Sequence, residues 1–358
     1  MEKALSLAQL VLGTTSPNPA VGAVVVKGGA IVGEGWTKSP GQPHAEIMAL
    51  RQAGTAARDG TLFVTLEPCC HWGRTPPCTD AIIEAGVAEV HMAVLDPNPL
   101  VDGKGAAQLK RAGVRTHVGE EEEEARVLVE AHAKFITTGL PFVVAKFAVS
   151  LDGKIATRTG DSKWITGSIA RKYAHQLRST SDAIMIGVNT VIADDPRLTA
   201  RSDDDRVIMK HPLRVIVDSK GRTPYTAKLF QEPGKILIAA ASIEGKEGEE
   251  LKRAGVDVVL LPAGDSSVDI NALMKLLGQR EVTSVLVEGG GTLLGSLFDE
   301  GLVDKVVAFI APMIIGGKEA LSPVAGDGVE RVSQALRLSR VRVEHLEPDI
   351  AVIGYCEV

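Results

Sequence analysis

The first eighty residues contain three side chains that bind transition metals, together with a carboxylate. His44 and Glu46 stand two positions apart, and eight residues separate Cys69 from Cys78. One imidazole and two thiolates suit Zn²⁺ and leave a fourth tetrahedral position open for water. We therefore predict a catalytic zinc site with His44, Cys69 and Cys78 as its ligands.

Glu46 is placed to move protons at this site without binding the metal. A carboxylate beside a metal-bound water can accept its proton and pass it to a leaving amine. Zinc-dependent base deaminases combine His-x-Glu with a Pro-Cys and a second cysteine in this way. Two alternatives remain at this point: a closed zinc site with Cys70 or His71 as fourth ligand, and buried cysteines without zinc. A closed site would leave Glu46 without a role.

Short apolar runs alternate with helical patterns along residues 1–140, which predicts a layered α/β domain. The expected helices lie at 2–12, 44–53, 77–85, 104–112 and 120–137, and the expected strands at 21–26, 30–34, 61–66, 88–94 and 114–118. On this pattern His44 opens a helix and Cys69 follows a strand.

Gly139-Leu140-Pro141 interrupts the pattern, and we place the domain boundary there, giving domains of 1–140 and 141–358. A second α/β series follows. Its expected strands lie at 142–149, 183–187, 213–217, 235–240, 256–261, 283–287, 305–310, 341–345 and 350–355, and its helices at 168–179, 246–254, 268–278 and 292–300. Arg201–Met209 is predicted to be a surface loop.

Composition excludes several classes of protein. The 358 residues carry 39 Lys+Arg against 45 Asp+Glu, a net charge of −6, so we expect no surface that tracks nucleic-acid phosphates. The longest apolar run, Val306–Ile315, is half of the roughly 20 residues that a membrane span needs. With no signal-peptide pattern at Met1, we expect a cytoplasmic protein whose cysteines stay reduced, which favours metal binding over disulfides.

Three segments carry a resemblance to a known family. They are PNPAVG at 17–22, PHAE at 43–46 and TLEPCCHWGRTPPC at 65–78. Together they resemble the bifunctional riboflavin-biosynthesis deaminase–reductases. Ordinary cytidine deaminases place two residues between the cysteines, whereas the eight-residue insertion here is distinctive of that family. Ala23 stands where family members often carry Cys, at a position that is not a ligand.

The resemblance implies a cytidine-deaminase-like α/β/α fold for the first domain and a specific substrate. That substrate is 2,5-diamino-6-ribosylamino-4(3H)-pyrimidinone 5′-phosphate, which loses its 2-amino group as ammonia. Asn18 and His71 match positions that bind the pyrimidine or its phosphoribosyl arm. Arg74, on the insertion, suits a phosphate.

The second domain lacks a Gly-x-Gly-x-x-Gly motif after its first strand. A glycine-rich turn comes late instead, at Glu288–Gly295, where a strand runs into glycines that open a helix. Backbone N–H groups in such a turn can hold a phosphate. Taken alone, this pattern is equally typical of an ordinary strand–helix connection.

Further segments of the second domain resemble the reductase half of the same family: Lys146–Ala156, Ser162–Thr166 and Gly187–Arg201. The resemblance implies a dihydrofolate-reductase-like α/β fold, NADPH as cofactor, and reduction of the ribosyl group of 5-amino-6-(5-phosphoribosylamino)uracil to ribityl. Lys146 is then the catalytic candidate, as a group that orients the opened sugar or donates a proton.

Motif matches imply the other residues of the reductase site. The cofactor residues are Ala148, Trp164, Thr190, Asp194, Ser219, Gly290, Gly291, Thr292, Leu293, Leu294, Gly295 and Ser296. The substrate residues are Ser162, Arg178, Leu198, Arg201 and Glu288. Arg178 and Arg201 are the expected phosphate ligands, because a guanidinium fork matches a phosphate monoester.

Two other functions stay open on the sequence. The chain could deaminate another base or nucleoside, and its C-terminal domain could be a non-catalytic module for oligomerisation or binding. The resemblance favours a small phosphorylated pyrimidine as partner, with neither nucleic acid nor membrane, and a homo-oligomer formed through the reductase domain.

Overall fold

The computed structural model describes residues 1–200, 211–243, 245–264 and 266–357. These residues form two compact units. One contains residues 1–141 together with 281–283, and the other contains 142–280 and 284–358.

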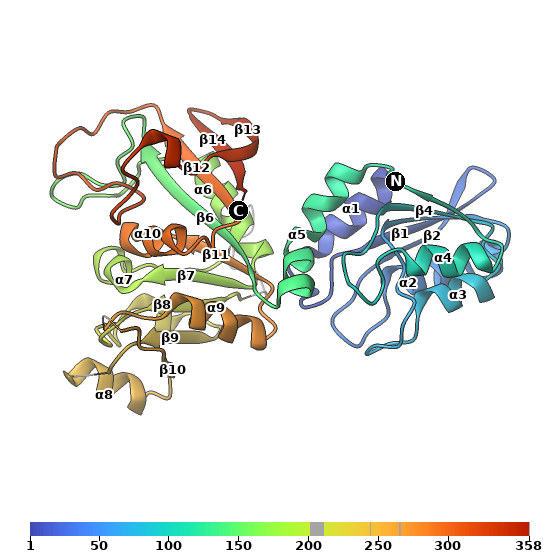
Figure 1. Ribbon diagram of the computed structural model, residues 1–358, viewed down its shortest axis with the longest axis horizontal. Coiled ribbons are helices and arrows are strands. Elements are labelled where there is room, and N and C mark those ends of the chain that lie inside the picture. The colour runs from blue at the N-terminus through green and yellow to red at the C-terminus, as the bar shows by residue number, and fades with distance from the viewer. Residues whose placement is uncertain (201–210, 244, 265, 358) are drawn as a thin grey trace. The chain divides into compact units, whose positions relative to one another are not determined.

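The first unit is a five-stranded sheet between two layers of helices (Figure 1). The strand order is β2-β1-β3-β4-β5, with β3, β4 and β5 parallel to one another. Helices α1 and α5 pack together on one face, while α2, α3 and α4 cover the other. The elements are α1 (Glu2–Val11), β1 (Gly22–Lys27), β2 (Ala30–Trp36), α2 (Ala45–Ala53), β3 (Thr61–Leu66), α3 (Cys78–Glu84), β4 (Glu89–Val94), α4 (Lys104–Arg111), β5 (Arg115–Val118) and α5 (Glu122–Thr138).

Close packing of α2 on the sheet fixes the start of that helix. A Cβ atom on Gly35 of β2 would lie 2.1 Å from the carbonyl oxygen of Ala45, so only glycine allows this approach. His44 is the N-cap residue of α2, and Glu46 lies in its first turn. The contact between β2 and α2 therefore positions both side chains at the edge of the sheet.

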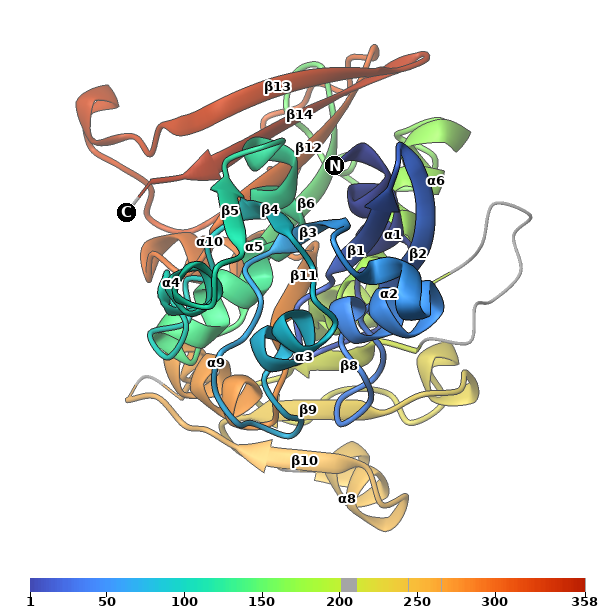
Figure 2. The same ribbon diagram turned by 90° about the vertical axis from the view of Figure 1, so that its right-hand side faces the viewer.

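The second unit is built on a nine-stranded sheet with the order β10-β9-β8-β7-β11-β6-β12-β14-β13. Its first seven strands are parallel, and β14 and β13 complete one edge in antiparallel fashion (Figures 1 and 2). The elements are β6 (Phe142–Ser150), α6 (Ser168–Thr180), β7 (Ala183–Gly187), α7 (Val188–Asp194), β8 (Leu213–Val217), β9 (Ile236–Ala240), α8 (Gly245–Arg253), β10 (Asp257–Leu260), α9 (Ile270–Gln279), β11 (Ser284–Glu288), α10 (Gly291–Asp299), β12 (Lys305–Ala311), β13 (Leu338–Leu346) and β14 (Asp349–Cys356).

The central strands are apolar because helices cover both faces of the sheet. Ile184, Ile216 and Leu286, from β7, β8 and β11, are fully buried. The expected strands and helices agree with the structure to within a few residues. The sequence did not predict α7 or the short 3₁₀ helices at Gly54–Ala57, Lys228–Gln231 and Val332–Gln334. The predicted loop Arg201–Met209 lies outside the described residues. Among the described residues, no helix is long and apolar enough to cross a membrane.

Candidate active sites

The three predicted zinc ligands meet at one point of the first unit. The Nδ1 atom of His44 lies 3.3 Å from the Sγ atom of Cys78 and 3.7 Å from that of Cys69. All three ligand atoms lie within 4.8 Å of one another. The donor set of one imidazole and two thiols fits Zn²⁺ and leaves room for a fourth ligand. Cys70 points elsewhere, toward the carbonyl of Leu100 at 3.8 Å, so the structure does not support it as that fourth ligand.

Glu46 is buried beside the ligands, with 4% of its surface exposed. Burial raises the pKa of Glu46 to about 7, although the charge of His44 opposes the rise. The hydrogen bond from Cys78 and the contact with His44 lower the pKa of Cys69, which favours its thiolate form. A bound zinc cation would lower the pKa of both groups, which for Glu46 opposes the effect of burial.

A buried carboxylate organises the chain that carries Cys69. Glu67, at the end of β3, accepts hydrogen bonds from the backbone N–H groups of Asp96, Gly103 and Ala106 at 3.2, 2.9 and 2.9 Å. Glu67 is 3% exposed, and these three donors replace its lost hydration. The end of β3 is thereby tied to the connection that follows β4 and to the first turn of α4.

A cavity of about 260 Å³ opens over the zinc ligands. His44, Glu46 and Cys69 line it, as do the predicted substrate residues Asn18, His71 and Arg74. The cavity is also lined by Asp96, Asn98 and His132, which were not predicted from the sequence. Asp96 and Asn98 follow β4 at the same edge as Cys69 after β3, and this shared edge was the signal that could have identified them.

A second group of potential ligands lies on β4 and β5 and consists of Glu89, His91 and His117. Its geometry fits a cluster of ion pairs better than a metal site. The guanidinium of Arg115 lies 3.0 Å from one carboxylate oxygen of Glu89, and Nε2 of His117 lies 2.8 Å from the other. A metal cation would have to displace these partners, so we assign no site there.

In the second unit, a buried carboxylate is held between two cations. Glu288 ends β11 and lies directly beside Lys146 of β6 in the parallel register. Arg178 of α6 donates from Nε and Nη2 to the two carboxylate oxygens at 2.5 and 2.9 Å, and Lys146 Nζ lies 3.5 Å from Oε2. Burial acts to raise the pKa of Glu288, but Arg178 and Lys146 outweigh it and lower that pKa to about 2.

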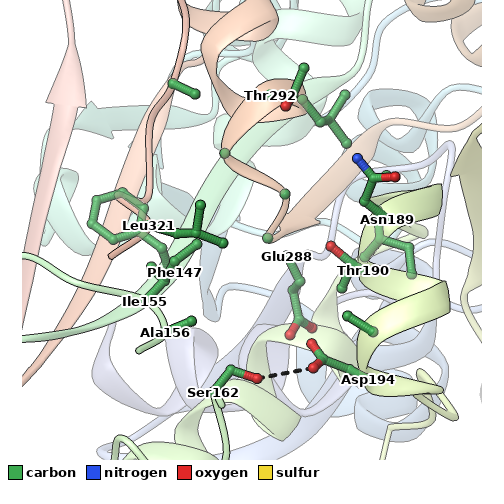
Figure 3. Close-up of a pocket in the computed structure, with 18 of the residues that line it drawn as sticks. Phe147, Ile155, Ala156, Ser162, Asn189, Thr190, Asp194, Glu288, Thr292 and Leu321 are labelled. Carbon is green, nitrogen blue, oxygen red and sulfur yellow. Dashed lines mark hydrogen bonds between the residues drawn. The ribbon is translucent and has the colours of Figure 1, made fainter. Parts of the chain in front are cut away.

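A cavity of about 1170 Å³ surrounds this group and is large enough for a dinucleotide and a substrate (Figure 3). The glycine turn that follows β11 forms one wall. Gly289 and Gly290 have φ of +85° and +88°, and a Cβ atom on Gly291 would lie 2.9 Å from the carbonyl oxygen of Ser322. Gly289, Gly290 and Gly291 are partly buried and line the cavity, so no Cβ stands between the backbone at the start of α10 and a pyrophosphate bound there.

Most of the residues predicted for the reductase site line this cavity. They are Lys146, Ala148, Ser162, Trp164, Arg178, Thr190, Asp194, Leu198, Ser219, Glu288, Gly290, Gly291, Thr292, Leu293 and Ser296. Leu294 and Gly295 do not, because they lie on the inner face of α10, where a Cβ on Gly295 would lie 2.1 Å from the Ala325 carbonyl oxygen. Arg201 lies outside the described residues.

Several residues around this cavity have uncommon backbone conformations or pairings. Trp164 and Leu198 have φ of +65° and +53°, which is costly for side chains of their size. Ser162 Oγ donates to Asp194 Oδ1 at 3.0 Å (Figure 3). Arg222, which was not predicted from the sequence, also lines the cavity and donates from Nη2 to Asn189 Oδ1 at 2.9 Å.

We predict that Cys78→Ser lowers zinc affinity by more than about 100-fold, since even loss of an outer-shell partner of a metal ligand costs 10–100-fold. Zinc content after dialysis against a graded chelator measures this. The matched control is Cys70→Ser, which should retain zinc. Equal loss of zinc in the two variants would contradict the assignment of ligands.

We also predict a pH-dependent effect of Arg178→Met. The lowered pKa of Glu288 means that its ionised form stabilises the fold above the ordinary pKa of 4.5, and that this stability is lost as pH falls toward about 2. Removing Arg178 should cost about 3–5 kcal/mol at pH 7, because a buried charge loses its main partner. Urea unfolding between pH 3 and 7 should show the difference from wild type narrowing as pH falls. A difference independent of pH would contradict this account.

Two family models match the chain. The cytidine and deoxycytidylate deaminase zinc-binding region matches residues 1–94, and the RibD C-terminal domain matches residues 141–352. The riboflavin biosynthesis protein RibD of Aquifex aeolicus is 46% identical over 98% of this chain and 96% of its own length. Its counterpart in Escherichia coli K12 is 40% identical over 98% and 97%.

Solved structures agree over the whole chain. Acinetobacter baumannii RibD has a TM-score of 0.87 at 39% identity, covering 100% of this chain and 98% of that one. The diaminohydroxyphosphoribosylaminopyrimidine deaminase/5-amino-6-(5-phosphoribosylamino)uracil reductase of Thermotoga maritima has a TM-score of 0.86 at 36% identity, covering 100% and 97%. The chain therefore belongs to the RibD family of riboflavin-biosynthesis enzymes, which join a zinc-dependent deaminase to an NADPH-dependent reductase.

Proposed function

We propose that the first domain deaminates 2,5-diamino-6-ribosylamino-4(3H)-pyrimidinone 5′-phosphate and that the second reduces the deaminated product with NADPH. The observation that supports the first step is the buried carboxyl of Glu46 beside three zinc ligands at a cavity. For the second step, it is the Glu288 group beside a glycine turn that lines the cavity. The name of the Thermotoga maritima relative describes the same pair of activities.

The deamination breaks the bond between C2 and its amino nitrogen, and the oxygen of water takes the place of that nitrogen. Zinc, when bound, supplies the Lewis acidity that activates water at neutral pH. Glu46 takes up a proton from water and delivers it to the leaving nitrogen, so that ammonia departs. A pKa raised by burial suits a carboxyl that must both accept and donate a proton.

The cavity residues account for recognition of the first substrate in this proposal. Asn18 and His71 hydrogen-bond the pyrimidine or its ribosyl arm, and Arg74 binds the phosphate as a charge-assisted fork. Arg74 is about half exposed, and its Nη2 donates to Glu281 of the same unit at 2.5 Å, so the phosphate would bind the other guanidinium nitrogens.

The reduction adds a hydride and a proton to the C1′=N bond of the ring-opened sugar, giving the ribityl chain. NADPH supplies the hydride when it is bound. Lys146 orients the opened sugar or donates the proton, and Glu288 holds the Lys146 ammonium in place at 3.5 Å. Ser162 and Leu198, on the cavity wall, contact the rest of the substrate.

Arg178 and Arg201, the two expected phosphate ligands, then have different roles. Three nitrogens of Arg178 already have partners, two with Glu288 and one with the carbonyl of Thr199 at 3.2 Å. Arg178 therefore acts on the substrate mainly by positioning Glu288. The phosphate of the second substrate is left to Arg201, which the sequence analysis had paired with Arg178 in that role.

We further propose that the protein acts in the cytoplasm as a homo-oligomer formed through the reductase domain. Its four cysteines are free thiols, which suits a reducing compartment. The edge strand β13 exposes Val341 and Val343, which are 53% and 54% accessible.

Light scattering should give a mass of two or more chains for the wild type, and a smaller mass for a Val341→Lys/Val343→Lys variant. A monomeric wild type would contradict this assembly.

For the deaminase, we predict that Glu46→Gln retains zinc but releases ammonia at least ~10²-fold more slowly, the usual effect of losing a general acid–base group. The amide keeps the size of the side chain but cannot exchange a proton. Ammonia release from the diaminopyrimidinone phosphate measures the first step, and metal analysis confirms the zinc.

The same variant provides its own control. With the deaminated substrate, NADPH oxidation by Glu46→Gln should equal that of wild type, because that chemistry uses the other domain. Near-normal deamination would remove Glu46 from the mechanism. If wild type oxidised no NADPH with this substrate, the alternative of a non-catalytic C-terminal module would gain support.

A further inference from the structure

The reductase cavity must distinguish two cofactors that differ by one phosphate, since NADPH carries a 2′-phosphate on its adenosine ribose and NADH does not. We propose that Arg222, held on a rigid turn beside Asn189, binds that 2′-phosphate and sets the preference for NADPH. The proposal deepens the function proposed above and rests on it.

The orientation of the bound cofactor follows from the residues that line each part of the cavity. The nicotinamide must reach the reacting carbon near Lys146 and Glu288, and the pyrophosphate suits the glycine turn at the start of α10. Residues of α7 lie next to this turn in space. The side chain of Thr190 lies 3.4 Å from the position of a Cβ on Gly290, and Asn189 precedes it in the chain (Figure 3). The adenosine half therefore extends across α7 toward Arg222.

The far end of the cavity is suited to an adenosine. Val217, Val268 and Ile270 line it and offer an apolar surface for a purine ring. Ser219 and Arg222 lie on the turn that follows β8, next to this surface. A hydroxyl and a guanidinium thus lie together at the end of the cavity where the adenosine ribose would be.

Buried hydrogen bonds make this turn rigid before any ligand binds. Asp218, fully buried at the end of β8, accepts from the N–H and the hydroxyl of Thr223 at 2.7 and 2.6 Å through one carboxylate oxygen. The carbonyl of Ser219 accepts from the N–H groups of Ala241 and Ser242 at 3.1 and 2.9 Å. Arg222 projects from the turn and is exposed, with Nη2 steered by Asn189. A preorganised guanidinium of this kind loses little conformational entropy when it binds a phosphate.

The other cations around the cavity are less suited to the role. Among the described residues, Lys146, Arg171, Arg178 and Lys318 also line it. Lys146 and Arg178 are engaged by Glu288. The guanidinium of Arg171 lies 4.5 Å from the ring centroid of Trp164 and donates to the carbonyl of Thr166 at 2.6 Å. Lys318 is a point charge that cannot match a phosphate with a fork.

The test measures binding to the full-length chain without turnover. Calorimetric titration compares 2′,5′-ADP with 5′-AMP, and fluorescence titration compares NADPH with NADH, at two salt concentrations. Arg222→Ala should weaken 2′,5′-ADP and NADPH by about 10- to 100-fold, the range for one or two charge-assisted hydrogen bonds, and leave 5′-AMP and NADH within about threefold of wild type. Arg222→Lys should recover part of the loss, and the salt dependence should fall in Arg222→Ala.

Lys220→Ala is the matched control, because Lys220 is an exposed cation on the same turn that lies outside the described lining of the cavity. It should bind all four ligands as wild type does. The assignment would be overturned if Arg222→Ala kept the preference for NADPH over NADH, or if it weakened both members of each ligand pair equally. It would also be overturned if Arg171→Ala or Lys318→Ala lost the preference instead. If wild type bound neither NADPH nor NADH, the proposed reductase function would fall as well.

Discussion

The cost of burying a carboxylate organises both sites of this protein. A buried carboxylate without partners is so unfavourable that it is either hydrogen-bonded, paired with a cation or protonated. Glu67 is hydrogen-bonded by three backbone N–H donors, and Glu288 is paired with the cations Arg178 and Lys146. Glu46 has too few partners to offset its burial, and its pKa rises to about 7. The cost of burial thus gives two rigidly held carboxylates, Glu67 and Glu288, and one carboxyl suited to proton transfer, Glu46.

The partners of each carboxylate also determine which elements are held together. Glu67 connects the end of β3 with the loop after β4 and with α4, which fixes the backbone just before Cys69. Glu288 connects β11 with α6 and β6 immediately before the glycine turn. Cys69 and Glu288 stand at the carboxyl ends of β3 and β11, where parallel neighbours constrain the backbone direction.

The sequence predicted most of the fold and the zinc site because the relevant signals are local. His44 opens a helix, and Cys69 follows an apolar strand; both positions can be read from short windows. Residues of the cavities were missed where the signal depends on which strands become neighbours. Asp96 lies near Cys69 only because β4 pairs with β3, and Arg222 reaches the reductase cavity only through the turn after β8. The short helix α7 was missed because its seven residues, VNTVIAD, carry no clear helical period.

The length of the insertion between the cysteines links metal binding to substrate recognition. Both ends of the segment from Cys69 to Cys78 are predicted zinc ligands, so a bound metal would close the segment into a loop and hold its ends together. Within that loop, His71 and Arg74 line the cavity, and the Thr75 hydroxyl lies 3.3 Å from Nε2 of His44, where it can fix the orientation of the ligand ring. A cysteine spacing of two residues has no room for these three side chains. In the proposed function the insertion therefore supplies both the recognition of a phosphorylated substrate and a second contact to a metal ligand, and both would depend on the zinc that holds the ends of the loop.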